Sequence, residues 1–138
     1  MKTILFICSG NTCRSPLAMA IARTYPKIYA FSRGLGALDG TPISACAKQA
    51  LELAKIPVPL HKARQLRKED VARAELILVM TKLHLKDMNL VYPEAAEKTF
   101  MLDPLMDVQD PFGDELEPYI KCLKEIQDSV KYWLTDPK

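Results

Sequence analysis

An unbroken apolar run, Ile4 to Ile7, is followed at once by the polar segment CSGNTCRS, residues 8–15. A continuous run, rather than an alternation of apolar and polar residues, is typical of a parallel strand that is covered on both faces. Pro16 and the apolar residues after it then predict a helix, with the proline at its first position. This segment therefore predicts strand, loop and helix, the opening unit of an α/β fold with a central parallel sheet.

The alternation of strands and helices continues along the chain. We expect further strands at 28–31, 75–80 and 98–102, and helices at 43–54, 67–74, 82–90 and 116–133, with an Asp- and Pro-rich loop over 103–118. This order implies a three-layer α/β sandwich with a four-stranded parallel sheet and right-handed crossovers. We expect a single domain over residues 1–138. Because ligands bind beyond the carboxyl ends of such strands, the loops after the first and fourth strands should share one edge.

Composition narrows the class of function. The chain has 138 residues, of which 49% are hydrophobic, and its 19 Lys and Arg against 17 Asp and Glu give a net charge of +2, so nucleic acid is not the default partner. The N-terminal apolar run is too short for a signal core or a membrane span. Four cysteines without a pairing rhythm do not indicate a secreted disulfide framework. We expect a cytoplasmic, monomeric protein that binds neither nucleic acid nor membrane.

The first loop carries the pattern cysteine, five residues, arginine, from Cys8 to Arg14, and Ser15 follows. A loop of this length before a helix can point backbone N–H groups inward, and with the positive end of the helix it suits a tetrahedral dianion such as phosphate. Arg14 supplies a planar, permanently charged fork for two phosphate oxygens. Cys8 in the same positive field is expected to be a thiolate and thus a nucleophile, hydrogen-bonded by Ser15. A nucleotide-binding P-loop is rejected because no Gly-Lys pair precedes Ser15.

Displacement of an alcohol or phenol from phosphorus needs a proton donor, and the resulting phosphocysteine needs an activated water. One carboxyl group can do both in turn. The candidate is Asp110 in the segment DPFG, because the proline after it stiffens a loop that can fold over the pocket. Asp103, Asp107 and Asp114 are competitors for this role.

Along nearly its whole length the chain resembles the low-molecular-weight protein-tyrosine phosphatase family. The resemblance is carried by ILFICSGNTCRSPLA at 4–18, HKARQL at 61–66, ELILVMTKLH at 75–84 and DPFG at 110–113. It implies that Cys8 is the nucleophile, that Arg14 binds the phosphate and that Asp110 is the general acid and base. It further implies a phosphorylated protein as substrate, and neither a metal nor an organic cofactor.

The resemblance also implies roles for other residues. Asn11 and Ser15 would hold the loop and tune the thiolate, and His61 would support them in a hydrogen-bond network. Cys13 would form a reversible disulfide with Cys8 that protects the nucleophile from over-oxidation. The positions expected to bind substrate are those of the loop and two at its rim: Ser9, Gly10, Asn11, Thr12, Cys13, Ser15, Leu38 and Phe112.

Other residues of the same chemical types are expected to be structural. Cys46 and Cys122 lie within helical patterns and should be packing residues, and His84 should be a solvated helix residue. Met19, Met80, Met88 and Met101 are expected to fill the core.

Three positions bear on the substrate class. Phe112 is followed directly by Gly113, whereas animal members of the family carry two aromatic residues after Asp-Pro, and Leu38 stands where they have an aromatic residue on the opposite loop. Both changes weaken the clamping of a phenyl ring. Thr12 stands where tyrosine-selective members usually have an aliphatic residue such as Ile, and the bacterial protein-arginine phosphatases of the family look like CTGNTCRSP with DPFG. Thr12 could admit a planar phosphoguanidinium and hydrogen-bond near it.

We therefore expect hydrolysis of phosphotyrosine, with phosphoarginine as the alternative. Arsenate reductase is disfavoured because Met80 stands where that family would present a further cysteine, and Cys46 and Cys122 are far apart in the sequence. A non-enzymatic phosphate-binding module would normally have lost Cys8 or Asp110, and both are present.

Overall fold

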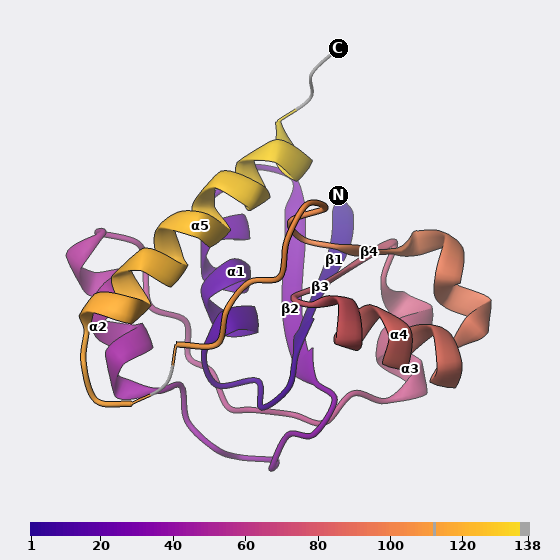
Figure 1. Cartoon of the computed structure of the whole chain (residues 1–138). Coiled ribbons are helices and arrows are strands. Elements are labelled where there is room, and N and C mark those ends of the chain that lie inside the picture. The colour runs from indigo at the N-terminus through magenta and orange to yellow at the C-terminus, as the bar shows by residue number, and fades with distance from the viewer. Residues whose placement is uncertain (112, 136–138) are drawn as a thin grey trace.

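Four parallel strands form one sheet in the order β2-β1-β3-β4 (Figure 1). Their bounds in this computed structural model, which describes residues 1–111 and 113–135, are β1 Lys2–Cys8, β2 Ile28–Gly34, β3 Leu76–Val79 and β4 Thr99–Met101. In the register Cys8 pairs with Gly34, and Ile7 pairs with Val79. The carboxyl ends of the three neighbouring strands are thus aligned, and the loops that follow them meet at one edge of the sheet.

Helices cover both faces of the sheet, which confirms the predicted three-layer α/β sandwich. One face carries α1 (Arg14–Ala22), α2 (Ala45–Leu53) and α5 (Glu117–Leu134), and the other carries α3 (Lys68–Arg73), α4 (Lys82–Val91) and the 3₁₀ helix η1 (Pro93–Lys98) (Figure 1). In β1, Ile4 and Phe6 pack against the first group while Leu5 and Ile7 pack against the second. Burial on both sides is the reason that this strand is continuously apolar.

Some element boundaries differ from the sequence-based expectation. The first helix begins at Arg14, two residues before Pro16, which is tolerated there because the first-turn N–H groups have no intrahelical acceptor. Strand β2 continues to Gly34, three residues beyond its expected end, because Ser32 to Gly34 pair with the end of β1. Helix η1 was not predicted.

Side-chain caps explain where two helices begin. The hydroxyl of Ser44 accepts a hydrogen bond from the backbone N–H of Ala47 (3.1 Å), and that of Thr81 accepts one from the N–H of His84 (3.0 Å). Each cap satisfies a backbone donor that has no partner within its helix. The cap at Thr81 starts α4 directly after β3, so the first turn of α4 lies at the carboxyl edge of the sheet.

Gly34 ends β2 at the point where the backbone of the 8–15 loop comes closest. A Cβ at this position would lie 2.5 Å from the carbonyl oxygen of Ser9 and 2.9 Å from the Cβ of Ala37. The N–H groups of Leu35 and Gly36 donate to the carbonyl oxygens of Cys8 and Ser9, both at 2.9 Å. The missing side chain therefore lets the chain after β2 brace the loop that follows β1.

Replacing Gly34 should loosen this brace. Gly34→Ala is expected to lower the free energy of unfolding by about 1–3 kcal/mol, because the backbone must move to admit the methyl group. Gly36→Ala is the matched control: a Cβ there meets nothing within 4 Å, and its effect should stay below about 0.5 kcal/mol. Chemical denaturation of the two variants measures the difference, and equal stabilities would contradict the close approach at Gly34.

Candidate active site

The candidate nucleophile lies at the end of the central strand. Cys8 is the last residue of β1 and is 2% exposed, and Arg14 is the first residue of α1, so the loop between them spans the junction of strand and helix. The N-terminus of α1 faces this loop with its unpaired backbone N–H groups and its positive end. The structure thus places a cysteine, an arginine and a helix N-terminus around one small volume, an arrangement that suits a dianion.

Asn11 holds the loop in shape from within. It is fully buried and has a positive φ of 59°, a conformation that asparagine adopts more readily than most residues. Its Nδ2 donates to the hydroxyls of Ser15 (2.8 Å) and Ser32 (3.0 Å), and its Oδ1 accepts from the backbone N–H of Arg64 (2.9 Å). One amide thus ties the loop to the start of α1, to β2 and to the segment after residue 60.

Ser15 connects this network to the sulfur of Cys8. Its hydroxyl oxygen lies 2.9 Å from the Sγ of Cys8. Because that oxygen already accepts a hydrogen bond from Asn11, its own proton is free to be donated to the sulfur. A hydrogen bond donated to sulfur stabilises the thiolate relative to the thiol.

The side chain of Arg14 is nearly buried and spans the loop and the segment after β4. One terminal nitrogen donates to the carbonyl oxygen of Val108 (3.0 Å), and Nε lies 3.8 Å from Oδ1 of Asp110. Among the described residues, Nε has no hydrogen-bond partner. A phosphate oxygen in the loop would satisfy this donor, whose burial is otherwise costly.

Asp110 is the carboxylate that faces Arg14. Its side chain is 57% exposed, so it can reach both a bound substrate and water. The carboxylates of two competitors accept hydrogen bonds from backbone N–H groups outside the loop. Asp107 accepts from the N–H of Lys82, and Asp103 accepts from the N–H of Leu105, each at 2.9 Å. Asp114 forms no ion pair with a described residue. The geometry therefore favours Asp110 over the other three.

His61 supports the loop from behind. Its Nε2 lies 2.7 Å from the backbone carbonyl oxygen of Asn11, and since a carbonyl can only accept, the proton is on Nε2. Burial lowers the pKa of His61, and the nearby charges of Arg23 and Arg33 lower it further. At neutral pH this histidine is therefore a neutral donor that holds the backbone of Asn11.

The prediction that His84 is a solvated helix residue is wrong. It is 5% exposed, and its Nε2 lies 2.8 Å from the hydroxyl of Ser9 in the loop. Burial lowers the pKa of His84 to about 4, with a contribution from Arg14, so the ring is neutral at pH 7. The signal that could have identified it is position: a helix that starts at the carboxyl end of the strand beside β1 has its first turn at the ligand edge.

Three further predicted site residues, Ser9, Gly10 and Thr12, lie in the loop itself. Ser9 is exposed, Gly10 and Thr12 are partly buried, and the carbonyl of Thr12 accepts from the N–H of Ser44 at 2.9 Å. Leu38 is 78% exposed. Phe112 lies outside the described residues.

All four cysteines are free, so the predicted pairing of Cys13 with Cys8 stays a prediction. Cys13 is buried, and a hydrogen bond with Cys122, together with burial, raises the pKa of the Cys13 thiol. Cys122 is buried as expected, whereas Cys46 is only partly buried. Met19, Met80, Met88 and Met101 are buried in the core as predicted.

The structure describes residues 1–111 and 113–135. Within these ranges no group of three or more His, Cys, Asp or Glu side chains is placed to hold a metal ion. No helix in the same ranges is both long enough and apolar enough to cross a bilayer.

Known proteins are similar to this chain in sequence and in fold. Residues 3–138 match the family model described as low molecular weight phosphotyrosine protein phosphatase. The chain is 35% identical to a probable low molecular weight protein-tyrosine-phosphatase, EpsP, of Ralstonia nicotianae, over 97% of this chain and 94% of the relative. It is 39% identical to a protein-arginine-phosphatase of Geobacillus stearothermophilus, over 92% of this chain and 90% of the relative. The crystal structure of a low molecular weight protein tyrosine phosphatase from T. tengcongensis superposes with a TM-score of 0.92, at 35% identity over 97% and 98% of the two chains. The chain therefore belongs to the low molecular weight phosphotyrosine protein phosphatase family.

Proposed function

We propose that residues 1–138 form a single catalytic domain that hydrolyses phosphotyrosine in proteins through a phosphocysteine intermediate, with phosphoarginine as the alternative substrate. The observation that carries the proposal is the pair of contacts at the two ends of one loop. At its start, Cys8 Sγ lies 2.9 Å from the Ser15 hydroxyl, which is free to donate. At its end, Nε of the buried Arg14 lies 3.8 Å from the exposed carboxylate of Asp110. Each group matches one requirement of phosphoryl transfer to a thiolate.

In the first step the phosphate enters the loop, where backbone N–H groups and Arg14 bind its oxygens. The thiolate of Cys8 attacks phosphorus, the bond from phosphorus to the leaving oxygen breaks, and Asp110 gives its proton to that oxygen. In the second step the carboxylate of Asp110 takes a proton from water as the water attacks the phosphocysteine. This step releases inorganic phosphate and restores the Cys8 thiolate, with Asp110 protonated again.

The substrate class depends on the width and chemistry of the loop and its rim. The printed names of two relatives divide between the classes: one is a probable protein-tyrosine-phosphatase and the other a protein-arginine-phosphatase. Thr12 is partly buried in the loop, where its hydroxyl could bind a guanidinium, and Leu38, which is exposed, offers no aromatic ring. These features support phosphoarginine as the alternative, while the family match over residues 3–138 supports phosphotyrosine.

We also propose that the enzyme works as a monomer in the cytoplasm, without a metal or organic cofactor. Every proposed catalytic group comes from one chain, so the chemistry needs no second subunit. Arg14 and the N-terminus of α1 supply the positive charge that a metal would otherwise provide. A free thiol nucleophile with three other free cysteines suits a reducing compartment.

Phosphate release from matched phosphotyrosine and phosphoarginine peptides tests the function directly. With EDTA present throughout, the wild type should release phosphate faster from the phosphotyrosine peptide, and Cys8→Ser should show no turnover. A preference for the phosphoarginine peptide would instead support the alternative substrate. Equal release by the wild type and Cys8→Ser would refute the enzymatic proposal.

Replacing the carboxylate should separate the two chemical steps. Asp110→Asn is expected to slow phosphoenzyme formation from phenyl phosphate by about 10²–10⁴-fold, because phenolate leaves poorly without a proton. With p-nitrophenyl phosphate the same variant should give a burst of one nitrophenolate per enzyme, since that leaving group needs no proton while hydrolysis of the intermediate is slow. Asp103→Asn, which keeps an oxygen for the N–H of Leu105, is the matched control and should resemble the wild type. The role of Asp110 would be excluded if both variants behaved alike.

The role of Thr12 can be tested by changing its shape and its hydroxyl separately. Thr12→Ile should lower the ratio of phosphoarginine to phosphotyrosine hydrolysis by about tenfold or more, because the larger side chain narrows the loop. Thr12→Val removes the hydroxyl but keeps nearly the same side-chain size. Comparison of the two variants shows whether the size or the hydroxyl of Thr12 sets the preference. If the ratio of kcat/KM for phosphoarginine to kcat/KM for phosphotyrosine is unchanged in both variants, Thr12 does not determine the substrate preference.

A further inference from the structure

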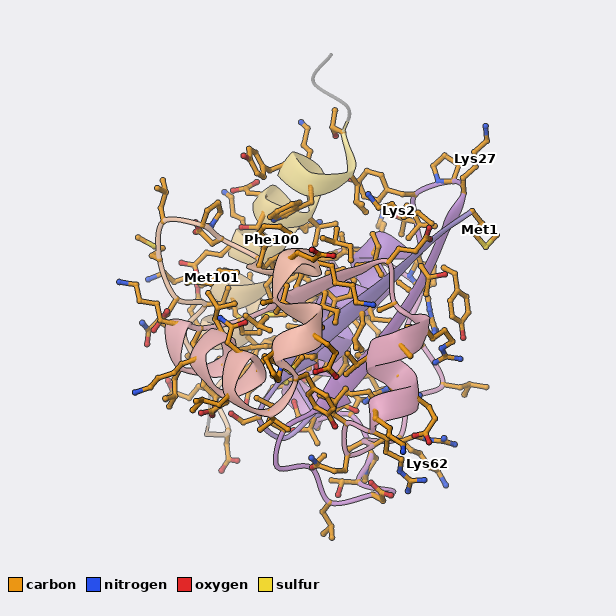
Figure 2. The ribbon with its side chains drawn as sticks, turned by 90° about the vertical axis from the view of Figure 1, so that its right-hand side faces the viewer. Met1, Lys2, Lys27, Lys62, Phe100 and Met101 are labelled. Carbon is orange, nitrogen blue, oxygen red and sulfur yellow. The ribbon has the colours of Figure 1, made fainter. Side chains whose placement is uncertain are left out.

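A second concave site lies beside β2, the strand at the edge of the sheet. It has a volume of about 630 Å³ and is bounded by the end of α1, by β2, by the segment after residue 60 and by Arg73 of α3. Its cationic side chains are Arg23, Arg33, Lys62, Arg64 and Arg73, and no described carboxylate lines it. Lys62 lies at the end of the molecule opposite Met1, Lys2 and Lys27, so it shares the end at which the strands terminate (Figure 2).

This concentration of charge is local, because the whole chain carries a net charge of only +2. Arg33 and Arg73 pair with Asp70, at 3.0 Å and 3.8 Å. In the described part of the chain, Arg23, Lys62 and Arg64 form no ion pair. Three cations beside the cavity are therefore not neutralised, and they create a positive potential that attracts anions.

Several of these cations are held in place before any ligand binds. Nε of Arg23 donates to the carbonyl of Ala30 (3.2 Å), and a terminal nitrogen of Arg33 donates to that of Ser32 (2.8 Å). The guanidinium of Arg73 lies 4.0 Å from the centre of the Phe31 ring. Such anchoring reduces the conformational entropy that is lost when an anion binds.

The cavity is distinct from the candidate active site but touches its support. The cavity is lined by none of the proposed catalytic residues Cys8, Arg14 and Asp110. Three of its residues do contact Asn11: the Ser32 hydroxyl and the His61 ring hydrogen-bond to it, and so does the backbone N–H of Arg64. An anion in the cavity would therefore lie behind the loop that holds Cys8.

We propose that this cavity binds a compact polyanion that carries two or more linked phosphate groups. Its volume falls within the range of about 300–1,000 Å³ that is typical of small-molecule sites. Arginine forks match phosphate oxygens, and several cations around one cavity call for more than one anionic group.

The neighbouring hollow argues against an extended acidic peptide. That hollow shares Arg33, Lys62, Arg64 and Arg73 with the cavity and adds Arg67, but, unlike the cavity, it is also lined by the carboxylates of Asp39, Glu69 and Asp70. A chain of acidic residues that continued in this direction would meet three carboxylates. A compact ligand confined to the cavity avoids this repulsion.

Inorganic tripolyphosphate is the probe, and saturating orthovanadate, a phosphate analogue, occupies the loop at Cys8. Calorimetry at low ionic strength should detect one tripolyphosphate site per chain that vanadate does not block. The triple variant Arg23→Gln, Lys62→Gln, Arg64→Gln should weaken tripolyphosphate binding by about tenfold or more. The change at Arg64 leaves the backbone N–H that donates to Asn11 in place. The control Lys48→Gln, Lys121→Gln, Lys124→Gln loses the same charge from exposed positions on α2 and α5 and should bind like the wild type.

A second readout locates the ligand. The chain has only two histidines, so their imidazole signals can be assigned by single substitutions. Arg23 and Arg33 lower the pKa of His61, so a polyanion between them should raise it, while His84 should not respond. The proposal is overturned if vanadate abolishes tripolyphosphate binding, if the triple variant binds as tightly as the wild type, or if the pKa of His61 does not move. None of these outcomes depends on turnover at Cys8, so these measurements test the cavity independently of the proposed phosphatase activity.

Discussion

The hydrogen bonds of one buried amide determine the shape of the candidate site. The side chain of Asn11 contacts Ser15, Ser32 and the backbone of Arg64, and its own backbone takes up a left-handed conformation that turns the loop. Because Nδ2 of Asn11 occupies the acceptor side of the Ser15 hydroxyl, the remaining proton points to the sulfur of Cys8. The hydrogen bonding of the nucleophile is thus set by the fully buried side chain of Asn11.

The sheet brings the other groups to the same place. Aligned carboxyl ends of β1, β2 and β3 collect the first loop, the brace after Gly34 and the first turn of α4 at one edge. The segment after β4 is tied back to β3, since the N–H of Val108 donates to the carbonyl of Met80 at 2.9 Å. That tie places the carbonyl of Val108 against Arg14 and Asp110 beside its guanidinium. Long-range backbone pairing, more than local preference, therefore assembles the site.

Much of this could be predicted from the sequence, because the decisive signals are local. Continuous apolar strands, alternating helices and the spacing from Cys8 to Arg14 are properties of short segments, and they gave the right sheet and the right loop. Asp110 was already the candidate from its place in DPFG, and the tertiary contacts add support, because the side chains of Asp103 and Asp107 accept hydrogen bonds from backbone N–H groups. His84 was misjudged because its helix has a polar exposed face, and only the position of the first turn next to Ser9 reveals its burial.

The most direct test of the account is detection of the covalent intermediate. ³¹P NMR of Asp110→Asn, mixed with p-nitrophenyl phosphate and trapped by rapid denaturation, should show one thiophosphate ester per chain, and peptide mapping should place it on Cys8. The double variant with Cys8→Ala should show no such signal. Turnover by the wild type without any phosphorus on Cys8, or with phosphorus on another residue, would contradict the central role of this thiolate.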